Sequence, residues 1–125
     1  HPATFAKECA TLSRFAPGRF TLGVAAGARP QDYEAVGVPW EKRGEVTDDC
    51  LDALFALSTP ENPPHSLGPI PDPGMQLLVG GASKAALRRM VERGHGYLGG
   101  GVTAEFMAHD VQAVKAAWAQ SRREG

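Results

Sequence analysis

Apolar residues recur at helical spacing in several stretches of the chain. In residues 3–14 they fall at i, i+4 and i+7, on Phe5, Cys9 and Leu12, which predicts an amphipathic helix. Similar spacing predicts further helices at 44–57, at 83–93 and from 103 to the end of the chain at Arg122–Gly125. Ser83 and Thr103 are the expected N-caps of the last two helices. A helical turn is expected at 31–35.

Three short runs bounded by glycine predict strands at 19–26, 75–81 and 96–98. The first has the pattern of a strand buried on both faces of a parallel sheet, and the second is also expected to be buried. Their alternation with helices implies an α/β fold with a parallel sheet and right-handed crossovers. Residues 58–74 hold six of the ten prolines and cannot form a regular element. We call this stretch the proline-rich seam.

Composition limits the classes of partner. The chain has 125 residues, 42% of them apolar, and a formal net charge of −1 without a Lys/Arg cluster. A sequence of this kind predicts no positively charged surface that would bind nucleic acid or an anionic membrane. No apolar run is long enough to span a bilayer. We therefore expect a soluble, cytoplasmic protein with no nucleic-acid or membrane partner.

Few side chains offer chemistry of their own. Cys9 and Cys50 fall at helical core spacing with no CxxC motif, so we expect both to be buried, reduced and inert. One face of the helix predicted at 44–57 carries four acidic residues: Glu45, Asp48, Asp49 and Asp52. We expect this face to be solvated and not to bind a metal ion, because no oxygen-rich loop accompanies it. His95 is favoured as a turn residue over a ligand contact, and we identify no catalytic residue.

Glycines end all three predicted strands, at the sheet edge where parallel α/β folds bind ligands. At Gly80-Gly81 the backbone can approach a phosphate, and the helix after Ser83 adds its positive dipole end. A tight strand-to-helix turn explains the same glycine pair equally well. The three glycines at 99–101 could form a similar anion site, but a flexible loop is the favoured interpretation for them. No GxGxxG, GK[ST] or GxSxG motif occurs.

Three segments together resemble the luciferase-like monooxygenase family, including its deazaflavin-dependent branch: GRFTLGVAAG (18–27), DYEAVGVPWEKRG (32–44) and LLVGGASKAALRR (77–89). The resemblance implies parallel (β/α) units of a TIM-type (β/α)8 barrel that binds FMN or deazaflavin coenzyme F-420. It also implies hydride transfer or monooxygenation of a small organic substrate. By resemblance the cofactor contacts come from the strand ends, at Ala26, Gly27, Gly80, Gly81, Gly99 and Gly100.

The chain also departs from that family. Bacterial luciferase has a cysteine and then an arginine where this chain has Ala25 and Ala26, which disfavours a light-emitting reaction. A full barrel needs ~250 residues, the chain begins at His1, and the seam is shorter than the family's usual connection. We therefore expect residues 1–125 to be one incomplete luciferase-like domain from the middle of a barrel.

Two other hypotheses compete with the oxidoreductase. A non-catalytic flavin-binding or scaffold homologue would explain the missing cysteine and arginine. An unrelated α/β domain whose glycines are only turns would leave the combined motif match unexplained. The oxidoreductase hypothesis allows a homodimer.

Overall fold

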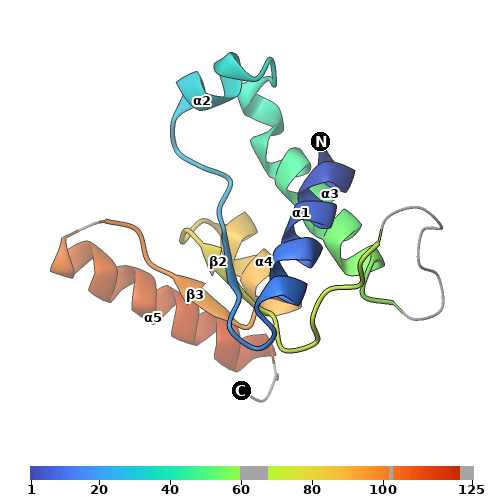
Figure 1. Ribbon diagram of the computed structural model, residues 1–125. Helices are drawn as coiled ribbons and strands as arrows, with labels where there is room; N and C mark the ends of the chain where they lie inside the picture. The colour runs from blue at the N-terminus through green and yellow to red at the C-terminus, as the bar shows by residue number, and fades with distance from the viewer. Residues whose placement is uncertain (60–67, 102, 122–125) are drawn as a thin grey trace. The chain divides into compact units, whose positions relative to one another are not determined.

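The structure is a computed structural model that describes residues 1–59, 68–101 and 103–121 (Figure 1). Its elements are α1 (Pro2–Phe15), β1 (Thr21–Val24), α2 (Pro30–Ala35), η1 (Trp40–Lys42), α3 (Arg43–Ala56), β2 (Gln76–Gly80), α4 (Lys84–Arg93), β3 (Gly96–Leu98) and α5 (Ala104–Ser121). All predicted helices and strands are present, and the 3-10 turn η1 is an addition. Contacts divide the chain into two compact units, 1–21 with 26–75 and 22–25 with 76–125.

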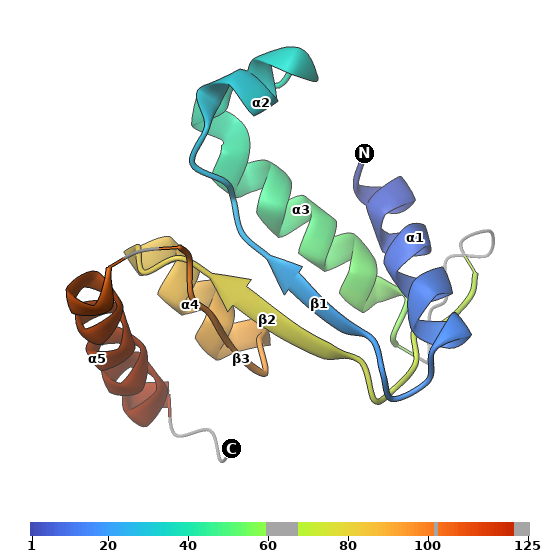
Figure 2. The ribbon, with the colours of Figure 1, turned by 60° about the vertical axis from the view of Figure 1, so that its left-hand side comes forward.

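The first unit is built on the packing of α1 against α3, which lie side by side in Figure 2. Ala6 and Ala10 of α1 are fully buried, and their small side chains let the helices approach closely. Leu51 and Leu54 of α3, with Leu57 directly after it, are the largest fully buried side chains of this unit. Removing these leucines from water is the main stabilising term of this unit.

The second unit holds a three-stranded sheet in the order β1-β2-β3. β2 and β3 are parallel, with Leu78 opposite Gly96 and Gly80 opposite Leu98. The arrows of β1 and β2 point the same way in Figure 2. The expected α/β class with parallel strands is therefore confirmed.

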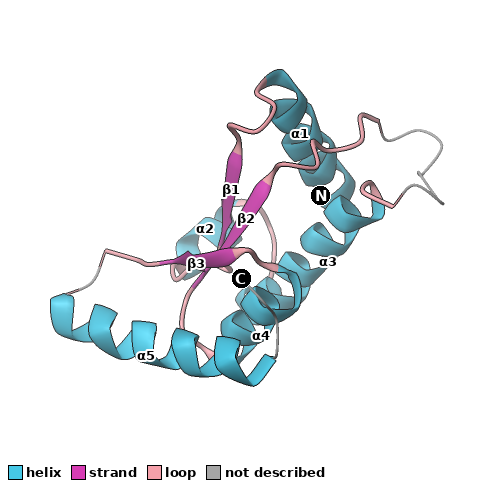
Figure 3. Cartoon of the chain, turned by 90° about the horizontal axis from the view of Figure 1, so that it is seen from below, coloured by secondary structure: helices cyan, strands magenta, loops and turns pink. Residues whose placement is uncertain are grey.

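Helix α4 covers one face of β2, and Figure 3 shows the strands with α4 and α5 of this unit. Leu77 and Val79 of β2 are buried, as are Ala86 and Met90 of α4. Side chains alternate between the two faces of a strand. Leu77 and Val79 therefore share one face, while Leu78 and Gly80 belong to the other.

The strand predicted at 19–26 differs from the observed β1. It is shorter, and its residues are exposed or half-buried in alternation instead of buried on both faces. β1 lies at an edge of the described sheet, where it pairs with β2 alone. A strand with one neighbour keeps more of its surface in contact with solvent.

Two helices bury different or fewer residues than the helical spacing of their apolar positions predicts. In α3 the buried positions are Thr47, Leu51 and Leu54, whereas Val46 and Cys50 are half-buried. Thr47 tolerates burial because its hydroxyl donates to the Arg43 carbonyl at 2.7 Å. In α5 the apolar residues that recur at i, i+4, i+7 and i+11 are half-buried throughout: Met107, Val111, Val114 and Trp118.

The proline-rich seam contains no helix or strand at 58–59 and 68–74, as expected, while residues 60–67, including His65, lie outside the described part of the chain. The predicted helix ending at Arg122–Gly125 also lies outside it. Among the described helices, none combines the length and apolar character that a bilayer crossing requires.

Candidate site at the carboxyl ends of the strands

Gly80 is the point at which the ends of the three strands meet. A Cβ atom added to Gly80 would lie 3.0 Å from the Ala25 Cβ, 3.4 Å from the Leu98 carbonyl oxygen and 3.7 Å from the Val24 carbonyl oxygen. Gly80 is buried, so close strand packing by itself accounts for a glycine here. Contact between Gly80 and a ligand stays a prediction.

Gly81 differs from Gly80 because it is exposed and has a φ of 95°. L-residues rarely adopt this conformation. Ala82 and Ser83 follow, and then α4 begins. The turn therefore presents backbone, with little side-chain cover, directly before a helix N-terminus.

The first turn of α4 supplies hydrogen-bond donors. Ser83 is its N-cap, and the Ser83 hydroxyl accepts from the Ala86 amide at 3.2 Å, as predicted. Within the described part of the chain, the amides of Lys84 and Ala85 have no protein acceptor. Helix N-termini of this kind attract anions through unpaired N–H groups and the helix dipole.

Ala26 and Gly27 belong to the first unit, where Tyr33 contacts both of them. The Tyr33 hydroxyl donates to the Ala26 carbonyl at 2.6 Å. Gly27 is exposed with a φ of 73°, and its added Cβ would lie 3.6 Å from the Tyr33 Cε2. The sequence-based prediction missed Tyr33, although an aromatic residue six positions after a strand-ending glycine was the available signal.

The third glycine group gives a mixed result. A Cβ on Gly99 would lie 2.5 Å from the Met107 Cε, so a side chain there would require the flexible end of Met107 to move. Gly100 is exposed with no atom within 4 Å of its added Cβ. Gly80 thus ends β2 and Gly81 follows it in the turn before α4, whereas Gly100 has no packing role.

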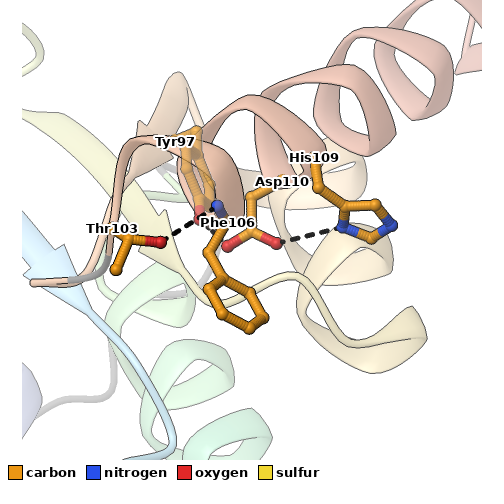
Figure 4. A network of polar contacts seen from close by, with 5 residues as sticks. All are labelled: Tyr97, Thr103, Phe106, His109 and Asp110. Carbon is orange, nitrogen blue, oxygen red and sulfur yellow. Dashed lines mark hydrogen bonds and ion pairs between the residues drawn. The ribbon is translucent and has the colours of Figure 1, made fainter.

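A polar network ties β3 to α5 (Figure 4). The Tyr97 hydroxyl donates to Asp110 Oδ2 at 3.1 Å, and His109 Nδ1 lies 3.6 Å from Asp110 Oδ1. Thr103 Oγ1 accepts from the Phe106 amide at 3.5 Å, in keeping with the predicted cap. Partial burial raises the pKa of Tyr97, and the hydrogen bond and charge of Asp110 raise it further. The protonated hydroxyl thus serves as a structural donor.

His95 is a structural turn residue, as the sequence favoured. Its Nδ1 accepts from the Leu77 amide at 3.0 Å, while its own amide donates to the Leu77 carbonyl at 2.7 Å. The backbone bond lies directly before the β2–β3 pairing, and the bond to Nδ1 means that the ring nitrogen facing β2 is already occupied.

The cysteines differ from each other. Cys9 is buried as expected, whereas Cys50 is only half-buried, and both are free thiols. Burial raises the pKa of Cys9 to about 11, with smaller contributions from Glu8 and Cys50. Burial also raises the pKa of Cys50. Among the described residues, no group of three or more His, Cys, Asp or Glu side chains could hold a metal ion.

Comparison with known proteins gives matches along the whole chain. Residues 1–125 match the sequence profile of a family described as luciferase-like monooxygenase. An uncharacterised protein of Mycobacterium tuberculosis is 36% identical over 124 residues, which cover 91% of this chain and 43% of that protein. An FMNH2-dependent dimethylsulfone monooxygenase of Pseudomonas putida is 30% identical over 107 residues, covering 74% of this chain and 29% of that enzyme.

A third relative is the 4-hydroxyprotoasukamycin monooxygenase of Streptomyces nodosus subsp. asukaensis. It is 35% identical over 63 residues, which cover 50% of this chain and 17% of that enzyme. The chain spans less than half the length of each of these three relatives.

Proposed function

The chain belongs to the luciferase-like monooxygenase family, whose fold is a TIM-type barrel, and from this premise we propose a flavin- or deazaflavin-dependent oxidoreductase. Its substrate would be a small organic molecule. The described strands are part of such a barrel, and enzymes with this fold bind their ligands at the carboxyl ends of the strands. The Gly81 turn with the first turn of α4 lies at that end of β2.

The observation that carries the proposal is the fit of this turn to a phosphate group. Gly81 is exposed and has no Cβ atom, and the amides of Lys84 and Ala85 have no acceptor within the described residues. Both FMN and the deazaflavin carry a phosphate. A phosphate oxygen can accept from these amides and gain from the helix dipole.

When bound, a flavin-type cofactor supplies the redox chemistry of such an enzyme. The chain's own contribution would be to bind the phosphate, orient the cofactor and exclude water around it. The Pseudomonas putida relative is named as FMNH2-dependent, which supports FMN as the first cofactor to test. Coenzyme F-420 is supported by the sequence resemblance alone.

A non-catalytic flavin-binding homologue is the second candidate. At the carboxyl ends of the strands in the second unit, the described residues Ala25, Gly80, Gly81, Leu98 and Gly99 include no acid, base or nucleophile. This candidate predicts cofactor binding without turnover. Cofactor oxidation that depends on a substrate would exclude it.

The test is a fluorescence titration of the intact protein with FMN and, separately, with coenzyme F-420. We expect micromolar or tighter binding of one of them. Gly81→Ala should weaken that binding by about tenfold, because a Cβ at this φ forces the turn to shift.

Gly18→Ala is the matched control, since Gly18 has a φ of 67° and no atom within 4 Å of its added Cβ. It carries similar backbone strain, so its cofactor affinity should equal that of the unaltered protein. Absence of binding to both cofactors would refute the proposal. Equal affinities of the two variants would refute the phosphate site.

A further inference from the structure

The two cysteines of the chain lie on the two helices whose packing builds the first unit. Cys9 belongs to α1 and Cys50 to α3, and both are free thiols in the structure. Each is the eighth residue of a 14-residue helix. The two helices pack against each other and run in the same direction in Figures 1 and 2. The cysteines therefore lie halfway along two neighbouring, parallel helices.

Each cysteine also belongs to the buried face of its helix. Cys9 is 5% exposed and follows the fully buried Ala6 by three residues. Cys50 follows Thr47 by three residues and precedes Leu54 by four, and both of these are buried. Side chains three and four residues apart share one face of a helix. Among the described helices and strands, α3 is the main packing partner of α1, so the faces that carry the two thiols meet.

Two further observations indicate that the thiols lie near each other. The ionised Cys50 is among the charges that raise the pKa of Cys9, and a charge acts in this way on groups close to it. Ala6 and Ala10 of α1 are fully buried, and their small side chains keep the helices close. Across such a contact, facing Cα atoms come within the about 4.4–6.8 Å that a disulfide spans.

We propose that Cys9 and Cys50 form a redox-active pair, which closes to a disulfide between α1 and α3 by exchange with a low-molecular-weight disulfide. The bond would join the two helices on which the first unit is built and close residues 9–50 into a loop. A cross-link of this kind stabilises the folded chain by restricting the unfolded one. This inference is independent of the proposed function.

The difference in burial sets the order of the exchange. Cys50 is half-buried and is the thiol that a reagent reaches first. Its thiolate attacks one sulfur of oxidised glutathione, whose S–S bond breaks, and one glutathione thiolate leaves. The Cys9 thiolate then attacks the Cys50 sulfur and displaces the second glutathione. The leaving thiolates take up the protons that the cysteines lost, so two protein thiols are oxidised and one disulfide is reduced to two thiols.

The test brings the intact protein to equilibrium in buffers of reduced and oxidised glutathione, starting from both the reduced and the oxidised protein. Burial raises the pKa of both thiols, so the exchange is slow and is followed until the two starting points agree. Acid quenching, alkylation of the remaining thiols and peptide mass spectrometry then count three products: the free dithiol, the glutathione adduct and the Cys9–Cys50 cross-link. The same titration is made in urea.

We expect the cross-link to be the main oxidised product and to form in monomers. Its equilibrium constant should be at least about tenfold higher in the folded protein than in urea, because a disulfide that fits the fold stabilises it by the same factor. An equal or lower constant in the folded protein overturns the proposal. Folded protein that keeps both thiols free, in a buffer that oxidises the chain in urea, also overturns it.

Two matched variants separate the steps, and alanine suits both helix positions. Cys9→Ala should stop at the glutathione adduct on Cys50, because the second thiol is missing. Cys50→Ala should leave the buried Cys9 largely unmodified under the same conditions. If the unaltered protein accumulates the adduct on Cys50 to the same extent as Cys9→Ala, or joins only into disulfide-linked dimers, the two thiols do not act as a pair. Cofactor binding by the protein would be untouched by that result.

Discussion

Asp72 joins two turns of the first unit through one carboxylate oxygen. Its Oδ1 accepts from the Gly18 amide at 3.1 Å and from the Gly74 amide at 3.0 Å. The Asp72 amide in turn donates to the Ser13 hydroxyl, which is fully buried, at 3.0 Å. These bonds connect the end of α1, the turn before β1 and the turn before β2. Residues at the amino ends of barrel strands typically serve stability.

We therefore predict that Asp72→Ala lowers the free energy of unfolding by about 2 kcal/mol, the scale of hydrogen bonds to a charged group. Urea denaturation followed by circular dichroism measures this loss. Asp32→Ala is the control, because its ion pair with Arg29 is highly exposed at 3.8 Å and such pairs contribute little. Equal losses in the two variants would contradict the assigned role of Asp72.

The different burial of the two cysteines predicts that their thiols react at different rates. Because burial raises the pKa of Cys9 to about 11, its reactive thiolate is scarce at neutral pH and increases up to about pH 11. Cys50 is less buried. In single variants Cys50→Ser and Cys9→Ser, alkylation at pH 8 should be slower at Cys9 than at Cys50. Faster alkylation of Cys9 would show that its burial is lost in solution.

The first turn of α4 holds both the Ser83 cap and the proposed phosphate site, and substitutions of Ser83 can separate the two roles. Ser83→Ala removes the hydroxyl that accepts from the Ala86 amide, which should lower stability by about 1 kcal/mol. Ser83→Asp keeps a capping acceptor, so its melting temperature should match that of the unaltered protein. Its carboxylate would, however, repel a phosphate at the same turn.

We expect Ser83→Asp to weaken FMN binding by more than tenfold, and Ser83→Ala to weaken it much less. Thermal denaturation and fluorescence titration of the same samples give the two quantities. If Ser83→Asp binds FMN as tightly as the unaltered protein, the phosphate is not held at the N-terminus of α4. This result would leave the capping role of Ser83 unaffected.

The elements were predictable to the extent that local patterns determine them. The Ser83 and Thr103 caps and the helices that follow depend on contacts a few residues apart, and β3 was predicted at its observed bounds. The burial of β1 depends on which strands lie beside it, and the buried face of α3 depends on where α1 packs. Apolar spacing alone cannot fix either of these tertiary contacts.

The sequence predicted which glycines lie at the strand ends of the candidate site. It could not predict whether each glycine is needed for packing or is exposed. The sequence left Gly80-Gly81 equally open to a phosphate contact and a tight turn. The structure gives Gly80 a packing role between strands and leaves Gly81 exposed. Tyr33 was missed because its bond to the Ala26 carbonyl depends on the path of the intervening loop, which no periodicity describes.

At the scale of the whole molecule, both edges of the described sheet are open: β1 and β3 each pair with β2 alone. Unpaired strand edges favour association with other chains, and a closed barrel removes them. The family fold is such a barrel, and the chain spans 43% of its Mycobacterium tuberculosis relative. We therefore predict that residues 1–125 will self-associate through these edges. Size-exclusion chromatography tests this prediction, and a monomer would contradict it.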